Sequence, residues 1–148
     1  MSLEERVQKD MIQAMKSKDA DKLRALRAIK SEILLAKTDG SGESVDEARE
    51  IKIIQKMVKS RQESLEIYSS QNRDDLAAKE KSEIDHIQTY LPKQMSEEEI
   101  ATRVDAIIAQ VNATSMKDMG KVMGIVQAEL GGKADGKTIA SLVKARLS

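Results

Sequence analysis

The stretch YLPKQMSEEE, residues 90 to 99, divides the chain into two differently built parts. Pro92 is the only proline among 148 residues, and it disfavours the helical conformation in the residue before it, so a preceding helix must end there. Ser96 and the glutamate three residues after it have the spacing of a capping box, which opens a new helix. We therefore expect an N-terminal domain over residues 1 to 91 and a C-terminal domain over residues 92 to 148.

The composition favours helices in both parts. Gly and Pro contribute only 7 and 1 of the 148 residues, whereas the helix formers Lys, Ala, Glu and Leu are abundant. Apolar side chains recur at helical spacing, and short polar turns bring consecutive helices back alongside each other. We predict an all-α protein with an N-terminal helical bundle of long helices and a small C-terminal three-helix domain.

Polar residues mark the expected helix starts. The caps expected in the first domain are Ser2, Asp19, Ser44 and either Asn72 or Asp74. A loop at residues 38 to 42 ends the second helix. In the second domain, Gly131 suits the position after a helix end where φ is positive, and Asp135 can cap the last helix.

Two further glycines fall inside an expected helix. Each of Gly120 and Gly124 costs close to 1 kcal/mol relative to Ala in that setting. We therefore expect a close approach at these glycines, by another helix or by the backbone of a ligand.

Charge is segregated although the chain is neutral overall, with 25 basic and 25 acidic side chains. Residues 116 to 148 carry six basic and three acidic side chains, a net charge of +3. Binding to a phosphate backbone needs charge and shape but no aromatic rings. The candidate RNA-binding residues are Lys117, Lys121, Lys133, Lys137, Lys144 and Arg146. A second basic row, Lys52, Lys56 and Lys59, is more typical of a solvated helix face.

Several classes of protein are excluded by composition. Without Cys there is no disulfide, thiol nucleophile or cysteine metal site, and two tyrosines are too few for a base-stacking platform. The start at Met1 to Glu5 lacks the basic region of a signal peptide, and no apolar run is long enough to span a bilayer. We expect a soluble cytoplasmic protein with no membrane or DNA partner, no cofactor and no metal.

Two motifs are candidates for catalytic sites, and each has a simpler interpretation. Glu83 and His86 form one copy of the Glu-x-x-His pairing that di-iron bundles need twice, so a packed helix residue is the better interpretation. Residues 131 to 138 match the string of a phosphate-binding P-loop, but the sequence before them predicts a helix where a P-loop requires a strand. The start of the last helix, near Lys133 and Lys137, is still a candidate site for another kind of phosphate.

The chain as a whole resembles the YqeY family, and its C-terminal part is similar to the tail domain of GatB, the B subunit of the glutamyl/aspartyl-tRNA amidotransferase. The matching segments are KMVKSRQES (56 to 64), NRDDLAAKE (72 to 80), YLPKQMSEEE (90 to 99), DMGKVMG (118 to 124) and GKADGKTIASLVKARL (132 to 147). In the amidotransferase this tail helps to hold tRNA while the amide is made elsewhere. The family association is therefore with carbon–nitrogen ligases that use glutamine as amide donor.

The resemblance implies a non-catalytic accessory module, because the catalytic cradle and the ATP and Mg²⁺ sites are not recognisable in this chain. The implied partners are tRNA or a complex of an amidotransferase and an aminoacyl-tRNA synthetase. Whether the chain is itself an enzyme stays open, since no catalytic residue is visible. The alternative function is a protein–protein interaction module with no role in nucleic-acid binding, using the Met-bearing helix at Gly120 and Gly124.

Overall fold

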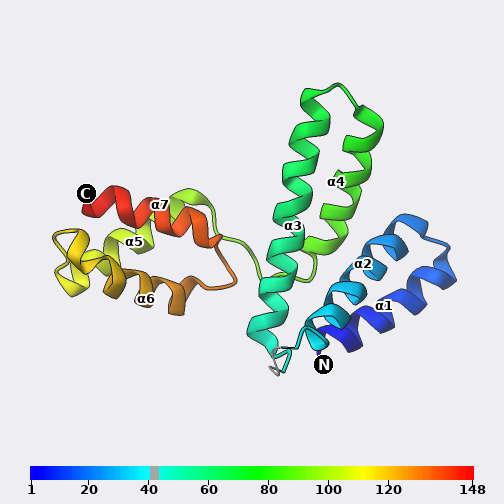
Figure 1. The fold of residues 1–148 in the computed structure, drawn as a ribbon, viewed down its shortest axis with the longest axis horizontal. Coiled ribbons are helices and arrows are strands. Elements are labelled where there is room, and N and C mark those ends of the chain that lie inside the picture. The colour runs from blue at the N-terminus through cyan, green and yellow to red at the C-terminus, as the bar shows by residue number, and fades with distance from the viewer. Residues whose placement is uncertain (41–43) are drawn as a thin grey trace. The chain divides into compact units, whose positions relative to one another are not determined.

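The computed structural model describes residues 1 to 40 and 44 to 148, which form seven α-helices and one short 3-10 helix (Figure 1). An isolated bridge between Gly131 and Ala134 is the only β-type pairing among these described residues. The all-α prediction is confirmed. In chain order the helices are α1 (Leu3–Ser17), α2 (Ala20–Lys37), α3 (Glu47–Ser70), α4 (Asp74–Gln88), α5 (Glu97–Val111), η1 (Met116–Asp118), α6 (Met119–Leu130) and α7 (Gly136–Leu147).

Three of the predicted helix caps form as expected. Ser2 and Ser96 each form a complete capping box with the glutamate three residues later. The Asp19 carboxylate accepts a hydrogen bond from the Lys22 N–H at 3.1 Å. Each of these bonds satisfies a backbone donor that a helix start leaves free, which fixes where the helix begins.

Other boundaries differ from the prediction. Asp46, not Ser44, caps α3, because its carboxylate accepts from the Arg49 N–H at 2.9 Å. Neither proposed residue caps α4: the N-cap position belongs to Arg73, and Asn72 before it has a φ of +57°. Of the loop expected at residues 38 to 42, residues 41 and 42 lie outside the described residues.

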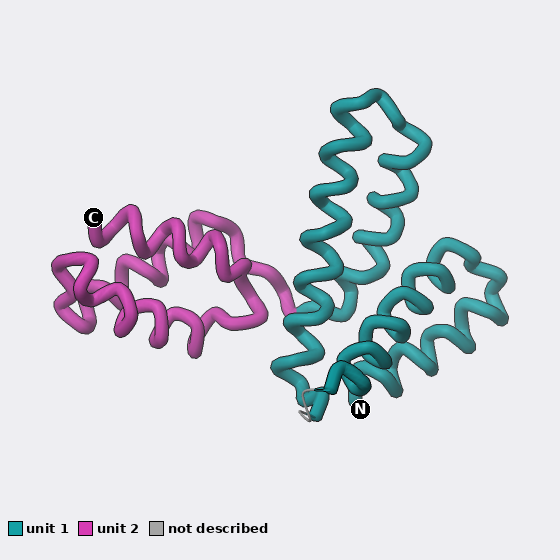
Figure 2. The backbone as a smooth tube through the Cα atoms, in the orientation of Figure 1, with its two compact units in different colours: residues 1–91 teal, residues 92–148 magenta. Residues whose placement is uncertain are grey.

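The chain forms two compact units, residues 1 to 91 and residues 92 to 148 (Figure 2). In unit 1, α1 and α2 form one helical hairpin and α3 and α4 form a second, and α2 packs against α4 to join them (Figure 1). The apolar face of each helix supplies the core, and α2 contributes several of the largest fully buried side chains. These are Leu26, Ile29 and Ile33.

A buried carboxylate joins the two hairpins of unit 1. Glu83 on α4 is 8% exposed, and its two oxygens accept hydrogen bonds from Arg24 Nε on α2 and Arg61 Nε on α3, each at 3.1 Å. We call these three residues the Glu83 cluster. It links three helices, and each arginine neutralises part of a charge that the core could not otherwise hold.

Tyr90 secures the end of unit 1. It is buried, its hydroxyl donates a hydrogen bond to Asp10 on α1, and the Arg6 guanidinium lies 5.2 Å from its ring centroid. Burial is the main cause that raises the pKa of Tyr90 well above its ordinary value, and the neighbouring Asp10 carboxylate raises it further. The residues just before Pro92 are thereby fixed to α1.

Unit 2 packs α5, α6 and α7 around an apolar core that includes Val104, Val126 and Val143, all fully buried. The turn between α6 and α7 is held tightly by backbone hydrogen bonds. The Lys133 and Ala134 N–H groups donate to the Leu130 carbonyl at 2.9 and 3.1 Å. This three-helix unit is the one that carries the candidate RNA-binding residues.

Candidate nucleic-acid interface

The six predicted basic residues lie on η1, α6, α7 and the turn before α7, and all six are exposed. Lys117 and Lys121 come from η1 and α6. Lys137 and Lys144 lie seven residues apart on α7, which is two helical turns, so they share one face of that helix. Together these elements place cationic side chains along α7 and at the start of α6.

One of the six is already paired. Arg146 Nε donates to the Asp105 carboxylate on α5 at 2.6 Å, so this guanidinium stabilises the packing of α7 against α5. The five lysines form no ion pair with any carboxylate of the described residues. Their ammonium groups are therefore available to an anionic partner, whereas Arg146 would first have to leave Asp105.

The turn that carries Lys133 has a fixed backbone. A Cβ atom added to Gly131 would lie 2.5 Å from the Gln127 carbonyl oxygen, a distance that only glycine tolerates. The positive φ expected at Gly131 is wrong: its φ is −56°, and Gly132 has the positive φ, +85°. The Lys133 carbonyl also accepts from the Met95 N–H at 2.8 Å, which anchors the turn to the start of unit 2.

The hollow at the start of α7 is not built to enclose a phosphate ion. A hollow of about 310 Å³ lies there, and two carboxylates, Glu97 and Asp135, line it beside Lys137. Two negative charges beside one positive charge disfavour an anion inside that hollow, so a phosphate that contacts Lys137 has to lie outside it, where the lysine side chain is exposed. The P-loop alternative is also excluded, because α6 precedes the glycine-rich turn where that motif requires a buried strand.

Gly120 and Gly124 share one exposed face of α6. A Cβ atom added at either position meets no atom of the described residues within 4 Å. The prediction that another helix of this chain approaches them is wrong, because α6 turns its buried valines, not these glycines, toward α5 and α7. An approach by a partner molecule stays a prediction.

The Glu83 cluster is the polar feature that sequence reasoning missed. The sequence motif pairs Glu83 with His86, but in the structure its carboxylate faces two arginines. A signal is present in the sequence: Glu83 lies four residues before the buried Ile87, on the apolar face of α4. Among residues 1 to 40 and 44 to 148, no three His, Asp or Glu side chains form a group that could hold a metal ion.

The geometry defines a class of protein: an all-α chain of two units, with a buried polar cluster in the first and exposed lysines on several elements of the second. Comparison with known proteins identifies it further. Residues 4 to 147 match the family model described as Yqey-like protein, so the chain belongs to the YqeY family.

Similar proteins include two from fungi. The chain is 32% identical over 131 residues to a protein of Pyrenophora tritici-repentis named "Altered inheritance of mitochondria protein 41, mitochondrial", covering 87% of this chain and 71% of that one. It is 29% identical over 147 residues to the protein of the same name from Lachancea thermotolerans, covering 95% of this chain and 76% of that one. A shorter match, 37% over 57 residues, is to a protein of Thermococcus gammatolerans named as one of the subunits of glutamyl-tRNA(Gln) amidotransferase, covering 36% of this chain and 9% of that protein.

These relatives correct one expectation. The predicted cytoplasmic location is wrong by this comparison, because the fungal relatives are named as mitochondrial proteins. The absence of Cys and an acidic start, on which that expectation rested, do not distinguish one intracellular compartment from another. Separately, none of the helices within the described ranges has the length and apolar character that crossing a bilayer requires.

Proposed function

We propose that unit 2 binds the phosphate backbone of tRNA through its lysines, and that the chain is a non-catalytic accessory module of tRNA-dependent amidation. The observation that carries this proposal is that five lysines of unit 2 are exposed and form no ion pair within the described residues. These are Lys117, Lys121, Lys133, Lys137 and Lys144. Unpaired lysines on a folded helical unit can displace counterions from RNA, which is the main source of sequence-independent affinity.

The comparison with known proteins supports the proposed link to tRNA-dependent amidation. One similar protein is by name part of a glutamyl-tRNA(Gln) amidotransferase, although the match covers only 9% of that protein. We propose tRNA as the partner on the basis of this sequence similarity alone. The hydrogen-bonded turn at Lys133 gives a physical reason to expect binding there. Its backbone is already fixed, so little conformational entropy is lost when the lysine side chain contacts a phosphate.

The proposal is tested by filter binding of the full chain to total tRNA at low ionic strength. We expect binding that Lys133→Glu combined with Lys137→Glu weakens strongly, because two attractive charges become repulsive. The matched control is Lys9→Glu combined with Lys16→Glu, which makes the same charge change at two exposed positions of α1. Absence of tRNA binding, or equal losses in both double variants, would contradict the proposal.

A second candidate function is docking of a partner protein on α6. It is favoured by the open faces of Gly120 and Gly124 and by Met116 before them, which is 42% exposed. A partner that is retained in a pull-down after nuclease treatment, and lost with Gly124→Leu, would support this function. A partner that nuclease releases would instead support binding through RNA.

A further inference from the structure

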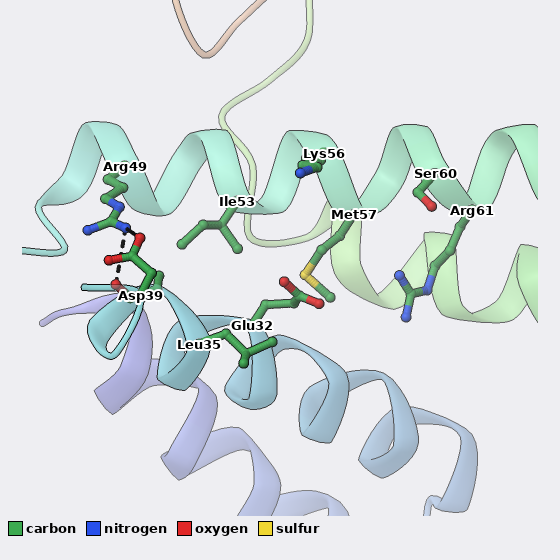
Figure 3. A pocket seen from close by; sticks show the side chains of 10 residues that line it. Glu32, Leu35, Asp39, Arg49, Ile53, Lys56, Met57, Ser60 and Arg61 are labelled. Atoms are coloured by element: carbon green, nitrogen blue, oxygen red, sulfur yellow. Dashed lines mark hydrogen bonds and ion pairs between the residues drawn. The ribbon is translucent and has the colours of Figure 1, made fainter. Parts of the chain in front are cut away.

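A hollow of about 360 Å³ lies between α2 and α3, wholly within unit 1 (Figure 3). Its volume lies in the range of small-molecule pockets, about 300 to 1,000 Å³. Leu35 from α2 and Ile53 and Met57 from α3 form an apolar wall, and the exposed cation Lys56 of α3 also lines the hollow. Leu35 is 60% exposed, so part of this apolar wall is in contact with water and can gain from being covered.

A positively charged group lies at one end of the hollow. Arg61 points from α3 into the space beneath that helix (Figure 3), and its side chain is 21% exposed. Its Nε atom is fixed by the hydrogen bond to Glu83 at 3.1 Å. Its two Nη nitrogens form no hydrogen bond within the described part of the chain. A guanidinium held in this way presents paired donors that match the two oxygens of a carboxylate.

A negatively charged group lies on the opposite wall. Glu32 belongs to α2, and its carboxylate points toward Met57 across the hollow (Figure 3). It forms neither an ion pair nor a hydrogen bond with a described residue. At the far end, by contrast, Arg49 donates to the Ala36 carbonyl at 3.1 Å and to Asp39, so the groups there are already engaged.

We propose that this hollow binds a free α-amino acid with an apolar side chain. The carboxylate lies on the Arg61 guanidinium, the ammonium group lies on the Glu32 carboxylate, and the side chain covers the apolar wall. A zwitterion satisfies both charged groups at once, because its two charges are separated by a single carbon atom. A simple carboxylate would leave Glu32 facing an anion, and a simple amine would leave Arg61 and Lys56 facing a cation.

The proposal is independent of tRNA binding, since the whole hollow belongs to unit 1 and the candidate RNA-binding lysines belong to unit 2. The probe is L-leucine, titrated into the isotope-labelled full chain and followed by the backbone amide signals of α2 and α3. Two related compounds carry the same side chain: N-acetyl-L-leucine lacks the ammonium charge, and L-leucinamide lacks the carboxylate. We expect saturable shifts with L-leucine and binding that is weaker by about tenfold or more for each blocked compound.

The variant that decides the proposal is Glu32→Gln, because it removes the ammonium partner without breaking a bond within the described chain. We expect it to weaken L-leucine binding by about tenfold. The matched control, Glu63→Gln on the exposed part of α3, should leave binding unchanged. Three results would overturn the proposal: no saturable shift with L-leucine, equal binding of either blocked compound, or equal binding by the Glu32→Gln variant.

Discussion

Replacement of Glu83 by Gln tests the polar cluster that joins the two hairpins of unit 1. The substitution keeps the size of the side chain but removes the charge that Arg24 and Arg61 share, each through a bond of 3.1 Å. A hydrogen bond to a charged group contributes about 1.5 to 3 kcal/mol, and breaking a buried pair costs about 3 to 5 kcal/mol. Because the two arginine side chains are 43% and 21% exposed, water compensates part of this loss. We expect a decrease of about 2 kcal/mol in the free energy of unfolding.

The assay is urea unfolding of the full chain followed by tyrosine fluorescence. The only tyrosines, Tyr68 and Tyr90, belong to unit 1, so this signal reports on unit 1 alone. Glu63→Gln serves as the control, because it makes the same chemical change at an exposed position. We also expect Arg61→Gln to cost more than Arg24→Gln, since Arg61 is the less exposed partner. If Glu83→Gln and Glu63→Gln unfold at the same urea concentration, the cluster does not stabilise the packing of the hairpins.

Three further substitutions have expected outcomes. Gly131→Ala should destabilise unit 2 by about 2 kcal/mol or more, because its Cβ would lie 2.5 Å from the Gln127 carbonyl oxygen. Gly124→Ala should instead stabilise unit 2 by about 1 kcal/mol, because the added Cβ enters open space. Urea unfolding followed by far-UV circular dichroism measures the change in the free energy of unfolding for both variants, and changes of the same sign would refute the reasoning. Tyr90→Phe should cost about 1 to 2 kcal/mol at neutral pH by losing the bond to Asp10. Because the folded pKa of Tyr90 is raised, the native chain should also lose stability as the pH rises above about 10, the unfolded value, and the Phe variant should lack this component.

Local patterns in the sequence were sufficient to predict the helical class and several helix starts. Capping boxes are local, because their two residues lie three positions apart, and Ser2 and Ser96 therefore form them as expected. Ser44 has the same spacing, yet Asp46 takes the N-cap position, since a carboxylate two residues later offers the same bond. A local pattern thus predicts that a helix begins but places its first residue only approximately.

Contacts between distant residues could not be predicted in the same way. Glu83 contacts Arg24, which lies 59 residues earlier, and periodicity alone gives no partner for an acidic residue on an apolar face. The pairing of Arg146 with Asp105 across 41 residues is of the same kind, and it removes one candidate from the RNA-binding set. The openness of Gly120 and Gly124 also depends on how α6 packs, which composition does not encode.

The most direct test of the proposed function is the salt dependence of tRNA binding by the full chain. Each phosphate that a lysine neutralises adds about 0.7 to 0.9 to the magnitude of the negative slope of log binding constant against log salt concentration, so five exposed lysines predict a slope of up to about −3.5 to −4.5. Lys133→Ala with Lys137→Ala should reduce its magnitude by about 1 to 2, and Lys9→Ala with Lys16→Ala should leave it unchanged. A chain that shows no tRNA binding at low salt, or a slope that the unit 2 variant does not alter, would contradict the account.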